Sequence, residues 1–290
     1  MPDSIPKSIQ REPIPILRPF IQFVWASYHE GHAESRPVPA RERMIPSGAM
    51  HLVFRFSEQP IRIFKSIEDT QGDTFCGAVV GGIRAGYYVK DVAPGAATLG
   101  ATLRPGACQA LFGIPADEVS GWHYPLADLW GPAAQTLYEQ LQEVGDFEGR
   151  LQLLESFLAA RVERVSGMHP AIAHALNRFS ATTDISAVVD ETGYSHRHFI
   201  HLFRQTVGLP PRVYSRLLRF QRILKHGFDR TFGRWIDVAL EAGYADQAHF
   251  NREFREMTGI SPTEYLVNRR GDSHHVLIPG QFRSRPNSSR

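Results

Sequence analysis

Two stretches of this 290-residue chain decide its fold, and each can be laid over the other. The first, Gly193–Tyr214, reads GYSHRHFIHLFRQTVGLPPRVY, and the second, Gly243–Tyr265, reads GYADQAHFNREFREMTGISPTEY. At an offset of 51 residues the coinciding pairs are Phe199/Phe250, Phe203/Phe254, Gly208/Gly259, Pro211/Pro262 and Tyr214/Tyr265. Such self-similarity predicts two copies of one supersecondary unit.

The first copy is predicted to form a helix, a tight turn and a second helix. Ile185–Thr192 carries apolar residues at helical spacing, and Gly193 permits the positive φ of a sharp turn. Ser195 is a suitable N-cap for a helix over residues 196–206, because its hydroxyl can accept a hydrogen bond from an unpaired backbone N–H.

The second copy repeats this order. A helix over Trp235–Ala242 is expected to lead into the turn at Gly243, and Asp246 is expected to cap a helix over residues 247–257. The paired phenylalanines of both copies should face inward, which leaves the polar side of each second helix outward.

These outward positions carry the side chains that could read DNA. We expect base-facing residues at Arg197, Ile200 and His201 in the first copy, and at Gln247, Ala248, Asn251 and Arg252 in the second. Arg, Asn and Gln pair with guanine and adenine edges in the major groove. One turn further along, Arg204 and Arg255 should contact phosphates. The alternative for either helix is a solvated surface, but two matched copies favour DNA binding.

The segment between the copies is predicted to be a linking helix. Pro211–Phe228 reads PRVYSRLLRFQRILKHGF, with apolar residues Val213, Leu217, Leu218 and Ile223 toward the two units and a basic face of Arg212, Arg216, Arg219, Arg222 and Lys225. Fifteen helical residues span about 22 Å. Such a rod could hold two recognition helices about 34 Å apart, one DNA turn.

The front of the chain is predicted to be β-rich. Alternating apolar and polar residues indicate strands at Met50–Phe56 and Ile61–Lys65, and further strands are expected at Gly86–Val89 and Thr98–Leu103. Turn residues separate these segments, which is typical of a small sheet or barrel. Helical spacing follows at residues 107–112, 126–129, 133–144 and 147–165.

The fold class is therefore expected to be α+β, with a β-rich, sensor-like domain and trailing helices at residues 1–166, an all-α domain with two helix-turn-helix units at 167–270, and a flexible tail at 271–290.

The net charge differs between the two halves of the chain. Residues 1–167 hold 15 Lys and Arg against 19 Asp and Glu, a balance of −4, whereas residues 168–290 hold 17 against 11, a balance of +6. This asymmetry favours a polyanionic partner for the basic half.

The back half resembles the AraC/XylS family of bacterial transcription regulators. The resemblance lies in Gly193-Tyr194-Ser195, Phe203-Arg204, Gly208-Leu209-Pro210-Pro211, Ala242-Gly243-Tyr244, His249-Phe250, Phe254-Arg255 and Thr258-Gly259-Ile260-Ser261-Pro262. It implies a transcription factor, here expected to be an activator, that binds double-stranded promoter DNA in the cytoplasm, on the nucleoid, and contacts RNA polymerase. Ile200 departs from the family's usual polar reader, and Gly227 and Phe228 interrupt the usual linking helix.

The front half is similar to an N-terminal domain of unassigned function found on many such regulators. This second resemblance rests on Arg43–Gly48, Leu103–Ala107, Leu111–Ala116 and Pro125–Gly131. It implies a sensory or interaction domain, through which a small molecule or a partner would regulate DNA binding. Whether an effector or a homodimer is involved stays open at this stage.

Other chemistry is weaker. His29, His32 and His51 lack the cysteine or acidic partners of a metal site, and Cys76 and Cys108 fit reduced thiols better than a redox switch. Trp25, Tyr28, Phe54, Phe56, Tyr87 and Tyr88 could form core or line a ligand cavity. No cofactor, metal, membrane segment, secretory signal or catalytic pair is expected. The alternative function is an enzyme or ligand-binding protein whose helical half serves only assembly.

Overall fold

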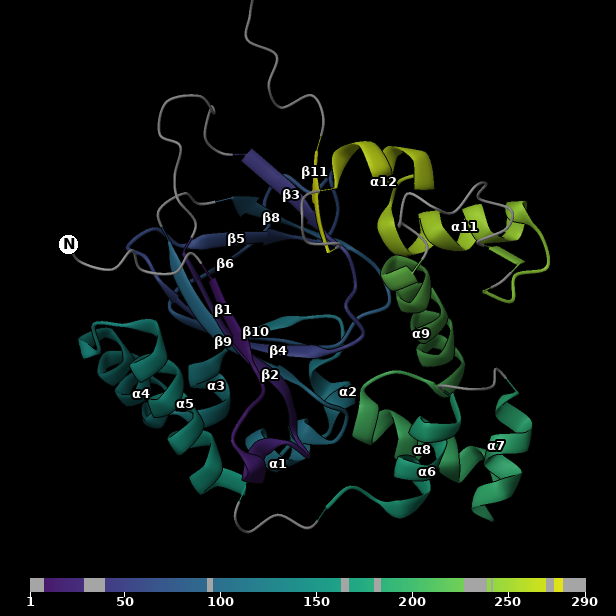
Figure 1. Cartoon of the computed structure of the whole chain (residues 1–290), viewed down its shortest axis with the longest axis horizontal. Coiled ribbons are helices and arrows are strands. Elements are labelled where there is room, and N and C mark those ends of the chain that lie inside the picture. Colours follow the sequence, from purple (N-terminus) through teal and green to yellow (C-terminus); the bar gives the residue numbers. More distant parts are fainter. Residues whose placement is uncertain are drawn as a thin grey trace, which may run out of the picture.

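The computed structural model describes residues 8–28, 40–92, 96–162, 167–179, 184–226, 239–240, 242–269 and 274–278. Strands dominate the front of the chain and helices the rest, which confirms the predicted α+β class (Figure 1). The strands are β1 (Ser8–Arg11), β2 (Ile21–Tyr28), β3 (Ala40–Met44), β4 (Met50–Phe56), β5 (Ile61–Phe64), β6 (Asp73–Phe75), β7 (Ala78–Gly81), β8 (Tyr88–Val92), β9 (Ala97–Leu103), β10 (His123–Pro125) and β11 (His275–Leu277).

Most of the helices lie after β9 along the chain. They are the short 3-10 helix η1 (Pro15–Leu17), then α1 (Ala107–Phe112), α2 (Ala116–Val119), α3 (Leu126–Trp130), α4 (Pro132–Glu143), α5 (Phe147–Val162), α6 (Pro170–Phe179), α7 (Ile185–Thr192), α8 (His196–Val207), α9 (Pro211–His226), α11 (Gln247–Thr258) and α12 (Pro262–Asn268). Among the described helices, none is both long enough and apolar enough to cross a membrane.

Two antiparallel sheets form the N-terminal domain. The first has the strand order β1-β2-β9-β4-β7-β10 and the second the order β11-β3-β8-β5-β6. The alternation in β4 places Met50, Leu52 and Phe54 inward, as its sequence predicts, and Phe54 lies opposite Leu99 of β9. The buried side chains of these strands belong to the main hydrophobic core, which also includes side chains of the helices.

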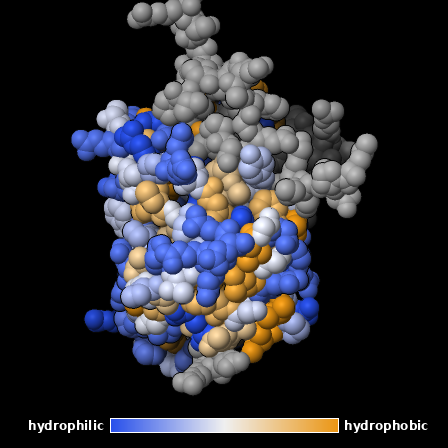
Figure 2. All heavy atoms as spheres, turned by 90° about the vertical axis from the view of Figure 1, so that its left-hand side faces the viewer, coloured by the Kyte–Doolittle hydropathy of each residue, from blue (hydrophilic) through white to orange (hydrophobic). Residues whose placement is uncertain are grey.

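The trailing helices cover the first sheet. Helix α5 packs on β2 and β9, and its residues Leu151, Leu154 and Leu158 are fully buried. Trp130 of α3 joins this layer by donating its indole N–H to the Leu111 carbonyl at 2.8 Å. The face that lies away from the C-terminal helices is mainly hydrophilic, with separate apolar patches (Figure 2).

Two segments differ from the sequence-based prediction. The strand expected at Gly86–Val89 occupies Tyr88–Val92 instead, because Gly86 and Tyr87 belong to the loop that meets the C-terminal helices. Part of the tail that was expected to be flexible is ordered: β11 pairs with the edge strand β3, and Val276 is fully buried. The remaining tail residues lie outside the described part of the chain.

The C-terminal helices dock directly onto the N-terminal domain. Helix α2 packs against α8, and the backbone N–H of Gly106 donates to the Thr206 carbonyl at 3.0 Å. On α9, the Gln221 amide donates to the Pro46 carbonyl and also lies 3.1 Å from His274, just before β11. Helices α8 and α9 are therefore held against the front domain by contacts outside the inter-domain linker.

Candidate nucleic-acid interface

The first helix-turn-helix unit forms as predicted. Asp184 caps α7 by accepting the N–H of Ala187 at 3.1 Å, and Ser195 caps α8 by accepting the N–H of His198 at 3.4 Å. Gly193 ends α7 in the left-handed conformation, with φ of +73°. This glycine permits the abrupt turn between the helices, because the left-handed region is costly for residues with a Cβ.

The second unit has the same cap at its recognition helix. Asp246 accepts the N–H of His249 at 2.7 Å, and Gly259 ends α11 with φ of +73°. Ser261 and Glu264 then form a reciprocal capping box at the start of α12. The helix predicted over Trp235–Ala242 lies almost wholly outside the described residues, as does the end of the predicted linking helix beyond His226.

The repeat also reproduces the aromatic packing inside each unit. In the first unit Phe203 packs against Phe199 and, edge to face, against Tyr214, both at 5.7 Å between ring centroids. In the second, Phe254 makes the equivalent contacts with Phe250 and Tyr265, both at 5.6 Å. The two copies therefore have equivalent core packing as well as the same sequence pattern.

The side chains expected to face bases are all exposed. The first-unit set is Arg197, Ile200 and His201 on α8, and the second-unit set is Gln247, Ala248, Asn251 and Arg252 on α11. Even the apolar Ile200 is 40% exposed, which leaves its methyl groups accessible for contact. Each set begins in the first turn of a capped helix, the part that enters the major groove in helix-turn-helix proteins.

The two residues expected at phosphates have different surroundings. Arg255 on α11 is exposed, whereas Arg204 on α8 points toward the N-terminal domain, where its guanidinium lies 3.8 Å from the carboxylate of Asp117 on α2. Arg204 is still half exposed, so this loose ion pair leaves donors available. Its contact nevertheless shows that the end of α8 faces a carboxylate of the front domain as well as solvent.

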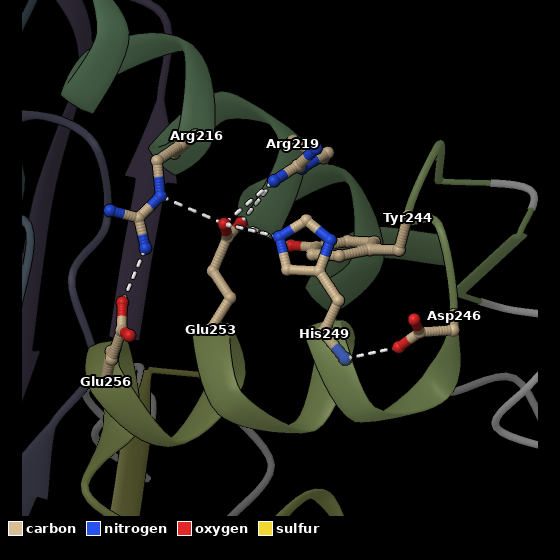
Figure 3. A network of polar contacts seen from close by, with 7 residues as sticks. All are labelled: Arg216, Arg219, Tyr244, Asp246, His249, Glu253 and Glu256. Atoms are coloured by element: carbon tan, nitrogen blue, oxygen red, sulfur yellow. Dashed lines mark hydrogen bonds and ion pairs between the residues drawn. The ribbon is translucent and has the colours of Figure 1, made fainter.

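The predicted basic face of the linking helix is wrong at two positions. Arg216 and Arg219 on α9 both bind the buried carboxylate of Glu253 on α11, at 2.9 Å and 2.8 Å (Figure 3). Arg216 also donates to Glu256 at 2.6 Å. A carboxylate with only 3% of its side chain exposed needs cations beside it, so these arginines brace α9 against α11.

Tyr244 completes this network by donating its hydroxyl to Glu253 at 2.6 Å (Figure 3). Burial works against the ionised form of Glu253, but hydrogen bonds from Arg219, Tyr244 and Arg216 outweigh it and lower the pKa of the carboxyl. The network thus sets the orientation of the second recognition helix on the linking helix.

Sequence reasoning missed Glu253, although the repeat contains a signal for it. Glu253 is equivalent to Leu202 at the offset of 51, and it lies between the inward residues Phe250 and Phe254. A carboxylate at an inward position of an amphipathic helix predicts cationic partners on the helix that packs against it.

Between the units lies a hollow of about 460 Å³. Ile185 of the first unit lines it together with Arg212 of α9 and Arg252 of α11. The start of the first unit and a candidate base reader of the second unit therefore border the same space, beside the linking helix.

The other candidate chemistry finds ordinary structural roles. His51 lies 2.7 Å from the Ser47 hydroxyl and 3.3 Å from Thr102, while His29 and His32 lie outside the described residues. Burial raises the pKa of the Cys108 thiol to about 12, which keeps it protonated and unreactive. Of the six front-domain aromatics, Phe54 is core, whereas Tyr87 lines a hollow between the domains.

Both parts of the chain match known protein families. Residues 188–268 match a family described as "Helix-turn-helix domain", and residues 9–125 match one described as "Domain of unknown function (DUF6597)". The first match covers nearly all of α7 to α12, and the second covers the strands β1 to β10 with the short helices between them.

Two curated proteins are similar to parts of the chain. The arabinose operon regulatory protein of Escherichia coli (strain K12) is 27% identical over 150 residues, which are 46% of this chain and 51% of that protein. The HTH-type transcriptional activator AarP of Providencia stuartii is 30% identical over 91 residues, which are 31% of this chain and 67% of that protein. The chain therefore spans about half the length of the first relative and about two thirds of the second.

Among solved structures, that of unsaturated fatty acid-bound wild-type ToxT from Vibrio cholerae strain SCE256 is similar, with a TM-score of 0.44 and 12% identity over 92% of this chain and 97% of that chain.

Proposed function

Because the chain belongs to the AraC/XylS family of transcription regulators, which are not enzymes, we propose that it binds specific sequences in double-stranded promoter DNA through both helix-turn-helix units. The observation that carries this proposal is the repeat itself. Two capped helices, with equivalent aromatic cores, each expose polar side chains in the first turn. These are the side-chain types that pair with base edges.

The linking helix suits two successive major grooves. Helix α9 has 16 residues and is therefore about 24 Å long. With the width of the units at its ends, this length approaches the ~34 Å between consecutive turns of one groove. A single chain could then read both half-sites, so a homodimer is not needed for two-groove contact.

The proposal also covers how DNA binding is regulated and how it affects transcription. The N-terminal domain contacts α8 and α9 directly, so a small molecule or partner bound to it could change DNA affinity, provided that it prefers one arrangement of the domains. The Providencia stuartii relative is named a transcriptional activator, which supports activation as the output of DNA binding. Contact with RNA polymerase is the step by which the proposed activation would occur. Such a protein would act in the cytoplasm, on nucleoid DNA.

A selection experiment tests DNA binding without knowledge of the operator. The full chain is incubated with a library of random-sequence duplexes, and enriched duplexes are then titrated at rising salt concentration. We expect a motif with two half-sites about 10 bp apart. We also expect log Kd to rise with log salt at a slope near 0.9 per phosphate contacted. No enrichment and a flat salt response would instead favour a ligand-binding protein whose helical half serves assembly.

A further inference from the structure

The hollow between the two helix-turn-helix units carries more positive than negative charge. Four arginines and two glutamates are among the residues that line its volume of about 460 Å³, which gives a balance of +2. The charged residues are Arg212, Arg216, Arg219, Arg252, Glu253 and Glu256. Cations gathered around one space raise its positive potential, and such a potential attracts anions. The hollow therefore has the charge of an anion-binding site.

The excess positive charge belongs to Arg212 and Arg252. Both glutamates are bound by Arg216 or Arg219 within the network that braces α9 against α11, so these four charges compensate one another (Figure 3). Arg212 lies in the first turn of α9 and is exposed, as is Arg252 on α11. Neither of these two arginines forms an ion pair with any residue that the structure describes. Their guanidinium groups are therefore available to an anion from outside the chain.

A serine with little exposure also lines this hollow. Ser215 follows Arg212 by three residues on α9, so the two side chains lie on the same side of the helix. Ser215 is only 5% exposed, and its hydroxyl forms no hydrogen bond within the described part of the chain. Most polar side-chain atoms at such burial have a partner. A hydroxyl can donate as a guanidinium does, so Ser215 and Arg212 are placed to donate to the same anion.

The hollow lies where a DNA backbone would pass between the units. Ile185, the first residue of α7, borders it from the first unit, and Arg252, a predicted base reader, borders it from the second. One minor groove separates two successive major grooves on the same face of a duplex. With α8 and α11 in those major grooves, the sugar–phosphate strands beside that minor groove lie against the linking helix. A phosphate is therefore the anion that the hollow would meet.

We propose that the hollow between the units binds a backbone phosphate of the DNA that separates the two half-sites, with Arg212 as its cation and the Ser215 hydroxyl as a second donor. This inference rests on the proposed function. It makes the linking helix a DNA-binding element that holds both units on the backbone, rather than only a spacer between them. Phosphate contacts set the register of a protein on DNA without reading its sequence, so Arg212 should contribute to affinity for every sequence.

A scan with neutral phosphate analogues tests this contact. Each phosphate between the half-sites of the selected duplex is replaced in turn by an uncharged methylphosphonate, and anisotropy titrations give the Kd of the full chain for each duplex. We expect one or two adjacent positions at which the wild type binds about tenfold more weakly. Arg212→Gln should bind the unmodified duplex about tenfold more weakly, and it should lose little more at those positions, because the donor for that phosphate is already absent. Arg212→Lys, which keeps the charge, should restore most of the affinity.

Lys225 provides the matched control. It is an exposed cation on the same helix, about 20 Å further along, and it does not line the hollow. Lys225→Gln should therefore keep the full wild-type sensitivity to the methylphosphonate. Ser215→Ala tests the second donor, and we expect it to bind the unmodified duplex about threefold more weakly. Unchanged affinity in Ser215→Ala would exclude this hydroxyl from the site.

Wild-type affinity that is insensitive to every spacer phosphate would overturn the proposal and leave the proposed function standing, as would an equal methylphosphonate penalty in the wild type and Arg212→Gln. Failure of the wild type to bind any duplex would refute the proposed function, and this inference with it. Calorimetric titration with pyrophosphate, in the absence of DNA, distinguishes a site for a free phosphate compound. We expect no binding that depends on Arg212, and a micromolar Kd that is lost in Arg212→Gln would overturn the assignment to the DNA backbone.

Discussion

Arg219 on α9 donates two hydrogen bonds of 2.8 Å to the carboxylate of Glu253 on α11. The first unit has Leu202 at the equivalent position. The same supersecondary unit is thus held by an apolar contact in one copy and by a buried ionic network in the other. This difference makes the orientation of the second recognition helix depend on charge.

Removal of the buried carboxylate should therefore be costly. In Glu253→Gln the arginines Arg216 and Arg219 lose their anion, and breaking such a buried pair typically costs about 3–5 kcal/mol. The matched control is Glu256→Gln, because Glu256 is half exposed and forms its ion pair with Arg216. We expect a loss below about 1 kcal/mol there. Urea unfolding monitors both variants, and equal losses would contradict the account of the network.

The same carboxylate should make stability depend on pH. The folded-state pKa of Glu253 is lowered, because the hydrogen bonds from Arg219, Tyr244 and Arg216 outweigh the opposing effect of burial. Its stabilising effect is therefore present above the ordinary carboxyl pKa of about 4.3 and is lost as the pH falls through the folded-state value. The gap in unfolding free energy between wild type and Glu253→Gln should shrink from about pH 6 to about pH 3. A gap that stays constant over this range would show that Glu253 keeps its ordinary pKa.

The helix-turn-helix units could be predicted from the sequence because their determinants are local. Ser195 and Asp246 cap the helices that follow them within three residues, and Gly193 acts on its own backbone. The alternation in Met50–Phe56 likewise identifies a strand and its inward face, because the pleat has a period of two residues. Such patterns determine elements without knowledge of their partners.

Contacts between distant segments could not be predicted in this way. The three-residue β11 has no distinctive composition, and its place is set by β3, more than 200 residues earlier, where His275 lies 3.1 Å from the buried Glu42. The Arg219–Glu253 pair and the Arg204–Asp117 contact also depend on how helices pack, which periodicity alone does not specify. Which exposed side chains meet bases stays a prediction until DNA binding is measured.

Reading and positioning residues should separate by mutation. Arg252→Ala should lose discrimination at one base pair, by about 1–3 kcal/mol, because it is expected to meet a base edge. Arg255→Ala, on the same exposed helix, should weaken all sequences alike and reduce the salt slope by about 1. Anisotropy titrations against the selected site and its single-base variants measure both effects. Identical behaviour of the two variants would refute this division of roles.

The C-terminal strand should protect the edge of the second sheet. A chain that ends at Asp272 lacks β11, so the β3 residues that pair with it, Glu42–Met44, lose their hydrogen-bonded neighbour. An uncovered edge strand opens more readily. Hydrogen exchange followed by mass spectrometry should therefore become faster in β3 and stay unchanged in β9, which lies inside the first sheet and serves as the internal control. Unchanged exchange in β3 would indicate that β11 does not hold this edge.

Matched glycine substitutions should measure the contact between the domains. Gly193 and Gly208 both end helices in the left-handed conformation, where a Cβ costs about 1–2 kcal/mol. A Cβ at Gly193 would meet nothing within 4 Å, whereas a Cβ at Gly208 would lie 2.5 Å from Ile83 and 3.1 Å from the carbonyl oxygen of Ala116. Gly208→Ala should therefore destabilise the chain more than Gly193→Ala, with an excess of about 1–3 kcal/mol from overpacking.

The second unit offers the same comparison at its own turn. A Cβ at Gly243 would meet nothing within 4 Å, as at Gly193, whereas a Cβ at Gly259 would lie 2.4 Å from Tyr87. Gly259→Ala should therefore cost more than Gly243→Ala, and Tyr87→Ala should remove most of that excess, because it deletes the ring that the new Cβ would strike. Unfolding free energies of wild type, Gly259→Ala, Tyr87→Ala and the double variant form a double-mutant cycle between the domains. If the cycle shows no interaction energy, the loop from Ile83 to Tyr87 does not contact the second unit in solution.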